Sequence, residues 1–260
     1  MPSLQSPTPT SPTPRPRLKQ RWHLRLLALL LTGIYLLPAQ AQRPLPTVPE
    51  PEARLPAIAL STLTERASLV ALVQVLDVDY EYTRDFPTGG TAFLKPLIVY
   101  KTAAAVPGII DVYEEGLHVH ECYFPNPSVI EEGQRFLVFL RPNPQVSGQW
   151  LGMPEGCRLS VLVTDQNRYA LRYPLKGIDI LPSAELDSAA EPLTFADAHA
   201  VLSLDDLTVA ERDELLAGGY LQALDDGNFR LTHGIDLTRF RQLLGEQLTT
   251  ERSLRRTPIE

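Results

Sequence analysis

The chain has 260 residues, with 24 Lys+Arg, 31 Asp+Glu, 24 prolines and two cysteines. Five basic and no acidic side chains lie in residues 1–41, so residues 42–260 carry all of the acidic side chains and are strongly acidic. Their negative charge would repel nucleic acid and an anionic membrane surface. Two cysteines exclude a disulfide-dense scaffold and a four-cysteine zinc module, and a hydrophobic content of 44% argues against a largely disordered chain.

Residues 1–41 have the layout of a secretory signal peptide. A basic stretch, Arg15–Arg25, precedes a mostly apolar run, Leu26–Leu37, and Ala39-Gln40-Ala41 supplies the small residues of a cleavage site. The apolar run is shorter than the ~20 residues of a membrane span. We therefore predict export to the periplasm or the extracellular space, with cleavage after Ala41. The alternative is an uncleaved segment that anchors the chain in the inner membrane.

Residues 42–58 are predicted to form a Pro-rich linker, because five prolines in residues 42–56 favour an extended, semi-stiff tether. Beyond the linker the hydrophobic pattern changes twice. Residues 59–182 begin with a short helix near 62–68 and continue as a β domain. Residues 183–260 are predicted to form a helical region with one hairpin.

The β domain is predicted from about eight short strands. Apolar Val75 and Val78 alternate with Asp77 and Asp79, as expected for a strand that leaves the core. The predicted strands cover residues 69–82, 91–102, 109–113, 117–124, 135–140, 149–153, 158–164 and 168–173. Strands this short and closely spaced favour an antiparallel sandwich or barrel over a parallel sheet with crossover helices.

The C-terminal region changes to helical signals. Capping-box spacings at Thr194–Asp197 and Thr208–Glu211 predict helices near 195–203 and 209–217. Asp225-Asp226-Gly227 predicts a hairpin, and Asp236 is a candidate cap of a third helix. This order resembles a winged helix, but residues 194–260 carry seven basic and twelve acidic side chains, and DNA binding requires the opposite sign. We expect no nucleic-acid partner.

Five segments of residues 60–174 resemble a recurrent type of exported bacterial protein of unknown function. They are Glu65–Val73, Leu97–Lys101, Ile109–Tyr113, Glu132–Leu140 and Gly156–Val161. The same layout is similar to the OB-type barrel of netrin-like and metalloproteinase-inhibitor domains. The resemblance implies a small antiparallel OB-like barrel. Together with the helical signals beyond it, the predicted fold class is mainly β, with that barrel followed by a small α-helical (α+β) C-terminal region. The resemblance implies no inhibitory activity, because the inhibitors act through an N-terminal cysteine and this chain would begin at Gln42.

The two cysteines carry the sharpest site prediction. An even pair in an exported chain predicts a disulfide between Cys122 and Cys157. The alternative is a metal site, because alternation on one strand places His118, His120 and Cys122 on a common face, and Cys157 would complete a His₂Cys₂ set for zinc or copper. That set requires reduced thiols. If the disulfide forms, His118 and His120 could still make a weak exposed metal site.

Acidic and aromatic side chains gather on the strand at 69–82. Asp77, Asp79 and Glu81 share one face with Asp85 just beyond, which could hold calcium but is more typical of a solvated edge that discourages aggregation. The aromatic candidates can stack on a ligand, or fill the barrel and pack its ends. They are Tyr80, Tyr82, Tyr123 and Trp150.

No catalytic signature is present. The sequence lacks a Gly-x-Ser-x-Gly elbow, a His-Glu-x-x-His motif and a Gly-rich phosphate loop, and His199 and His233 stand alone as surface or cap residues. We expect a binding or structural interaction module without a cofactor, whose partner is a protein or a small ligand. The alternative is a metal-dependent or hydrolytic enzyme that uses His118, His120 and Glu121.

Overall fold

The computed structural model describes residues 57–103, 105–117, 122–127 and 132–244. The predicted signal peptide, residues 1–41, and nearly all of the predicted linker, residues 42–58, lie outside the described residues and stay predictions. Among the described residues, no helix is both long and apolar enough to span a membrane.

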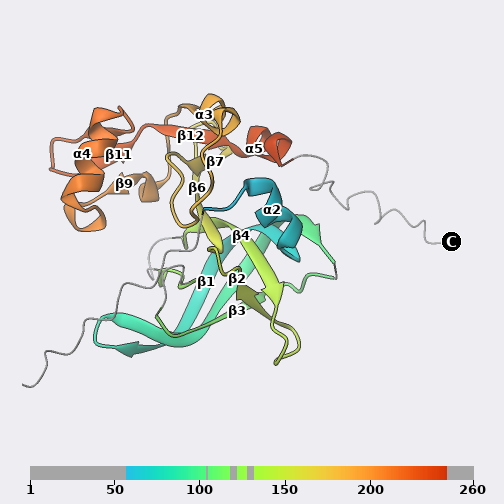
Figure 1. Cartoon of the computed structure of the whole chain (residues 1–260). Coiled ribbons are helices and arrows are strands. Elements are labelled where there is room, and N and C mark those ends of the chain that lie inside the picture. Colours follow the sequence, from blue (N-terminus) through green and yellow to red (C-terminus); the bar gives the residue numbers. More distant parts are fainter. Residues whose placement is uncertain (1–56, 104, 118–121, 128–131, 245–260) are drawn as a thin grey trace, which may run out of the picture. The chain divides into compact units, whose positions relative to one another are not determined.

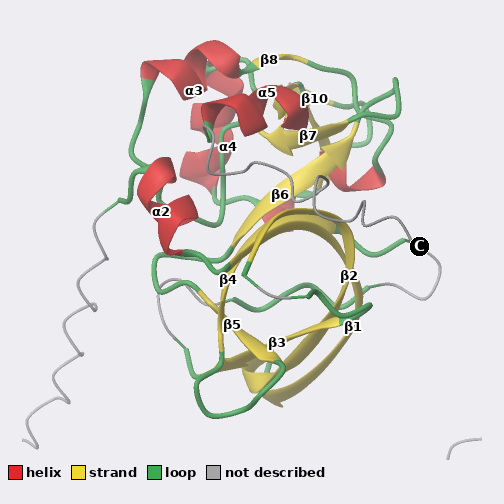
Figure 2. Cartoon of the chain, turned by 90° about the vertical axis from the view of Figure 1, so that its right-hand side faces the viewer, coloured by secondary structure: helices red, strands yellow, loops and turns green. Residues whose placement is uncertain are grey.

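Five strands close a barrel in the described part of the chain. They are β1 (Leu69–Thr83), β2 (Phe86–Thr102), β3 (Ile110–Glu115), β4 (Arg135–Pro142) and β5 (Gln149–Gly152). The strands follow the order β1-β2-β3-β5-β4, and a further pairing of β1 with β4 closes the ring that Figure 2 shows. Strands β3 and β5 run parallel and the other pairs antiparallel. The predicted fold class, a mainly β chain with an OB-like barrel and a helical C-terminal region, is confirmed.

Strand β1 begins as a continuous apolar run because both of its faces are covered. Leu69, Ala71 and Val73 pack in the core inside the barrel, whereas Val70 and Leu72 pack in a second core outside it. A strand that is buried on both faces is apolar throughout rather than alternating. Alternation starts only past Val75, where one face of the strand meets solvent.

Four strands extend the sheet beyond β4, as Figure 1 shows for β6 and β7. They are β6 (Arg158–Val163), β7 (Tyr169–Arg172), β12 (His233–Asp236) and β8 (Glu191–Pro192). Strand β12 pairs antiparallel with both β7 and β8, so a strand near the C-terminus lies beside one from the predicted β domain. The predicted boundary at residue 182 therefore crosses a continuous sheet.

The described residues form four α-helices, α2 (Leu60–Arg66), α3 (Ala184–Ala189), α4 (Val209–Ala217) and α5 (Leu237–Leu243). Three of them, α2, α3 and α5, cover the outer core. Buried Leu63 of α2 and Phe240 of α5 share one core with residues of β1, β4 and β7. Side-chain caps begin three of these helices at Ser183, Thr208 and Asp236, the last two at positions that the sequence predicted.

Lys101, at the end of the predicted Leu97–Lys101 strand, closes the end of α2. Its ammonium donates hydrogen bonds of 2.8 Å each to the carbonyl oxygens of Thr64 and Glu65. The last carbonyls of a helix have no partner within the helix, so the lysine satisfies two of them. Burial of the ammonium lowers the pKa of Lys101.

A small sheet accompanies α4. It contains β9 (Val201–Leu202), β10 (Leu221–Ala223) and β11 (Phe229–Leu231), in the order β10-β11-β9. Strands β10 and β11 form the predicted hairpin around Asp225-Asp226-Gly227. Buried Leu215, Phe229 and Leu231 join a third core that also contains Leu162 of β6.

Two predicted elements are wrong. The predicted strand 117–124 is irregular at 117 and 122–124. The backbone N–H of Cys122 donates to the Glu114 carboxylate, and the backbone N–H of Phe124 donates to the Tyr80 hydroxyl. These two N–H groups are therefore not used to pair with a neighbouring strand. The predicted helix 195–203 is replaced by a short 3₁₀ turn, Ala198–Ala200, followed by β9. The four residues 118–121 lie outside the described residues.

Candidate functional site

The β1–β2 hairpin extends past its neighbours on both sides. Strand β4 pairs with β1 only over Leu69–Gln74, and β3 pairs with β2 no further toward the tip than Gly89. In Figure 1 the hairpin reaches toward the lower left, away from the helices of the described region. Two aromatic side chains at the tip are exposed, Tyr82 by 53% and Phe86 by 62%. Exposed aromatic pairs of this kind are common in binding surfaces.

Strands β1, β2 and β3 present a common outer face, which we call the acidic face. Exposed Asp77, Asp79 and Glu81 alternate along β1, opposite an uncharged row on β2, and β3 follows with a second row. Cross-strand partners point to the same side of a sheet, so these rows lie on one surface. The acidic face contains Asp77, Asp79, Glu81, Gly89, Thr91, Phe93, Asp111, Tyr113 and Glu115.

Both acidic rows act on one side chain, that of Tyr113 in the middle of the β3 row. The pKa of the Tyr113 hydroxyl is raised by desolvation, by the nearby carboxylate of Glu115 and by that of Glu81 on β1, on the far side of β2. Carboxylates of β1 and of β3 therefore lie within electrostatic reach of one hydroxyl. Among the described residues, none of the five carboxylates of the acidic face forms an ion pair.

The glycine at position 90 allows the two hairpin strands to approach. Its φ is +129°, and a Cβ atom built there would lie 2.1 Å from the carbonyl oxygen of Asp79. No other residue fits this position without moving the β1 backbone. Gly90 therefore maintains the register that aligns Asp79 with Thr91 on the acidic face.

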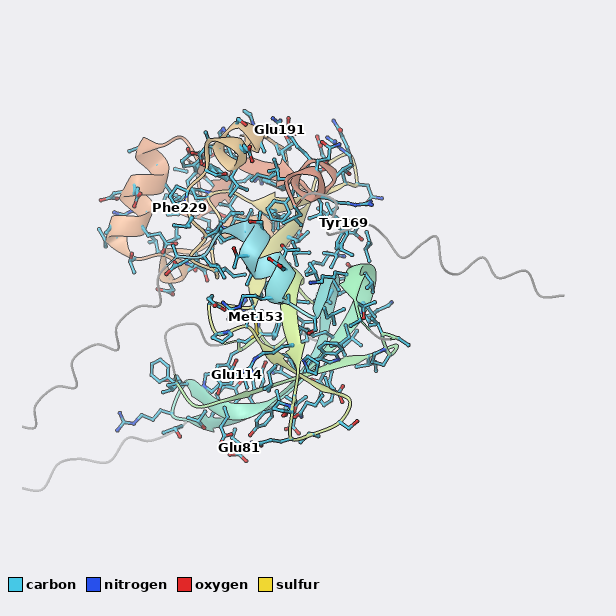
Figure 3. The ribbon with its side chains drawn as sticks, turned by 45° about the vertical axis from the view of Figure 1, so that its right-hand side comes forward. Glu81, Glu114, Met153, Tyr169, Glu191 and Phe229 are labelled. Atoms are coloured by element: carbon cyan, nitrogen blue, oxygen red, sulfur yellow. A yellow bond between two sulfur atoms is a disulfide. The ribbon has the colours of Figure 1, made fainter. Side chains whose placement is uncertain are left out.

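The inner side of the hairpin is built differently. The Tyr80 hydroxyl accepts a 2.9 Å hydrogen bond from the backbone N–H of Phe124, and burial raises the pKa of Tyr80 to about 12. The Tyr80 and Tyr123 rings meet edge to face at 5.1 Å, and Trp150 is only 8% exposed. Figure 3 labels Glu81 on the outer side of the hairpin and Glu114 on the inner side. Of the four aromatic residues singled out in the sequence, Tyr82 alone is exposed.

Cys122 and Cys157 form the predicted disulfide, with Cα atoms 5.9 Å apart. Both residues are 1% exposed and belong to the core inside the barrel. The bond connects the segment after β3 to the residue that precedes β6. Gly152 makes room for it, because a Cβ atom there would lie 2.9 Å from the Cβ atoms of both cysteines.

The disulfide bears directly on the metal alternative. A His₂Cys₂ set requires two free thiolates, and both sulfur atoms are bonded to each other. His118, His120 and Glu121 lie outside the described residues, so the weaker His118/His120 site stays a prediction. Among the described residues, no group of three or more His, Cys, Asp or Glu side chains could hold a metal ion. The calcium alternative at Asp77, Asp79, Glu81 and Asp85 therefore gains no support.

Both histidines of the C-terminal region make structural contacts. The His199 Nε2 lies 3.1 Å from the carbonyl oxygen of Glu132, and the His233 Nδ1 lies 2.9 Å from the Thr232 hydroxyl. The Thr232 hydroxyl donates its own hydrogen to the carbonyl oxygen of Gly219, at 2.7 Å. His233 must therefore carry its proton on Nδ1 as the donor of that contact.

Asp197 connects the C-terminal region to strands β4 and β6. Its side chain is 5% exposed and accepts hydrogen bonds from the backbone N–H groups of Val163, at 3.1 Å, and His199, at 3.0 Å. An Arg135 nitrogen on β4 lies 3.7 Å from the same carboxylate. These contacts explain why the predicted helix 195–203 does not form. The capping-box aspartate binds the Val163 N–H of β6 and caps the short 3₁₀ turn Ala198–Ala200, instead of lying within the first turn of a longer helix.

Replacing Asp197 by alanine is expected to lower the free energy of unfolding by about 2 kcal/mol, because two partly buried N–H groups lose their acceptor. Asp197→Asn should cost less, since the amide oxygen still accepts. Denaturant unfolding followed by circular dichroism measures both variants, with exposed Asp205→Ala as the control. If Asp197→Ala lowered the free energy of unfolding by no more than about 0.5 kcal/mol beyond the control, the Asp197 carboxylate would not stabilise the contact between the C-terminal region and β6.

Comparisons with protein-family models, with curated proteins and with solved structures give no match for this chain. The resemblance to netrin-like domains and to exported bacterial proteins therefore stays an expectation from the sequence.

Proposed function

We propose that this chain is an exported binding module of the periplasm or the extracellular space, which holds a protein or small ligand at its β1–β2 hairpin. The observation that carries the proposal is the hairpin itself, which extends past β4 and β3 and exposes Tyr82 and Phe86 at its tip. Large exposed aromatic side chains are costly to leave in water and recur where partners bind.

The fold supports a binding role at this position. OB-type barrels bind ligands on the face of their second and third strands and on the loops that flank it. Here that face is the acidic face, and the loop between β1 and β2 is the hairpin tip. The negative charge of the acidic face opposes nucleic acid as the ligand.

Two observations support export. The first is the basic, apolar and small-residue order of residues 1–41. The second is the Cys122–Cys157 disulfide, which persists in oxidising compartments and is rare in reducing ones. If the signal peptide is cleaved, residues 42–58 would form an N-terminal extension of the domain. If it is retained, they would tether the domain to the membrane anchor.

The amount of ligand recovered with the double variant Tyr82→Ser, Phe86→Ser is expected to be about tenfold lower than with the wild-type chain. The reason is that aromatic anchors dominate binding energies. The measurement is the amount of ligand crosslinked to the full chain in its source organism and recovered with it. Folding should be unchanged, since both side chains are exposed.

A matched control replaces exposed apolar residues elsewhere on the molecule. Leu204 and Val209 are 56% and 66% exposed and lie outside the barrel, so Leu204→Ser, Val209→Ser should retain the ligand. Loss of ligand in the control but not in the hairpin variant would indicate that the ligand binds near Leu204 and the start of α4. Failure of the wild-type chain to retain any ligand would remove the binding role.

A further inference from the structure

The outer face of β1, β2 and β3 carries charge in a regular pattern. On β1 the carboxylates of Asp77, Asp79 and Glu81 occur at every second residue, which spaces them by about 6.8 Å along the strand. On β3, Asp111 and Glu115 occupy the two ends of a second row. Strand β2 lies between the rows, so they are about 10 Å apart.

The strip between the two rows is uncharged. Gly89, Thr91 and Phe93 of β2 face outward there, directly opposite Glu81, Asp79 and Asp77. Buried Gly89 and half-buried Thr91 are small residues at the tip end, and half-buried Phe93 offers an apolar surface at the other end. A chain that lies along this strip would have carboxylates on both sides.

From this arrangement we propose that the occupant of the hairpin is an extended polypeptide segment rich in lysine or arginine, which lies along β2 on the acidic face. The inference rests on the proposed binding function and names its partner class. Side chains on one face of an extended segment repeat every ~6.8 Å, so cationic residues at alternate positions match the spacing of the β1 carboxylates.

Charge complementarity distinguishes this occupant from others. Several acidic groups elsewhere have cationic partners, as in the pairs Arg168–Asp236 and Lys176–Glu211, whereas the carboxylates of the acidic face have none among the described residues. A metal ion is disfavoured, because no group of described residues has a suitable ligand set. The potential of such a face attracts cationic partners and repels anionic ones.

Phe86 at the hairpin tip extends the same surface. It is 62% exposed and pairs with Thr83, which follows Glu81 by two residues and therefore lies on the same side of β1. Tyr82 points to the other side of the hairpin, where its ring centroid lies 6.5 Å from that of Tyr80. Aromatic faces attract ammonium and guanidinium groups, and the aliphatic stems of lysine and arginine pack on apolar surface. One cationic segment can therefore engage the carboxylates and Phe86 together.

The experiment measures binding of synthetic peptides to the purified full chain by titration calorimetry. The main probe is a peptide of alternating lysine and threonine. One comparison peptide has the same composition with all lysines in one block, and a second is a helix-forming alanine peptide with the same number of lysines. The chain is tested as wild type and as the variant Asp77→Asn, Asp79→Asn, Glu81→Gln.

The matched control removes the same charge from exposed positions outside the barrel, as Glu185→Gln, Asp205→Asn, Asp225→Asn. We expect the alternating peptide to bind more tightly than either comparison peptide. The β1 variant should weaken its binding about tenfold, and the control variant less than about twofold. The carboxylate of Asp77 accepts a hydrogen bond from the Val78 N–H, and the amide oxygen that Asp77→Asn introduces preserves this local contact.

Three outcomes would overturn the inference. Equal loss in the β1 and control variants would show diffuse attraction by net charge, and tighter binding of the helical peptide would exclude an extended occupant. The third outcome separates the proposed binding role of the hairpin from the proposed cationic partner. In it, the Tyr82→Ser, Phe86→Ser variant loses the natural ligand but the β1 variant retains it. The hairpin would then bind its ligand without the carboxylates.

Discussion

Replacing both Cys122 and Cys157 by alanine is expected to lower the free energy of unfolding by about 3–4 kcal/mol. The disulfide closes a loop across a sequence separation of 35, and a crosslink of this span removes that much conformational freedom from the unfolded chain. Both side chains are buried in the barrel core, so the variant also loses packing. Guanidinium unfolding of wild type and variant, each with and without reductant, measures the effect.

Reductant supplies the control, because it should destabilise the wild-type chain and leave the double variant unchanged. Equal sensitivity of the two proteins would assign the effect to something other than the Cys122–Cys157 bond. Thiol titration of the chain isolated from outside the cytoplasm should find no free thiol. Two free thiols with one bound zinc ion would restore the metal alternative.

Phe240→Ala should cost about 3–5 kcal/mol, the second large effect that we expect. The ring is 1% exposed and lies in the core that also contains Phe139 of β4 and Leu171 of β7. Truncation therefore opens a cavity between the C-terminal helix and the strands of the predicted β domain. The measurement is denaturant unfolding monitored by Trp150 fluorescence inside the barrel and by far-ultraviolet circular dichroism.

The two probes separate a shared core from an independent C-terminal domain. A shared core predicts that both signals shift together to lower denaturant concentration. If Trp150 fluorescence kept its wild-type midpoint while the helical signal moved, residues 183–244 would unfold as a unit of their own. Val209→Ala, at a position 66% exposed, is the control and should change stability by less than about 0.5 kcal/mol.

Local signals in the sequence predicted most of the elements. Alternation after Val75 located the outward part of β1, and Thr208 and Asp236 cap α4 and α5 as their spacing indicated. These predictions needed only residues that are near one another in the chain. The two errors both involve long-range contacts, since Tyr80 binds the N–H of Phe124 and Asp197 binds the N–H of Val163.

The candidate site was only half visible in the sequence. Asp77, Asp79 and Glu81 stand out as one strand face, and they are exposed as expected for a solvated edge. That Asp111 and Glu115 form a second row on the same surface depends on the register of β2 with β3. No local pattern determines that register, because it results from how the long hairpin packs on the barrel.

The pairing of β12 with β7 has a consequence for how the protein is made. Residues 173–232 separate these strands in the chain, so during synthesis β7 exists for some time without its neighbour. An unpaired strand edge is a template for association with other chains. A chaperone that holds the nascent chain until residue 244 has emerged would protect it, and a shortened chain that ends near residue 182 would retain that open edge permanently.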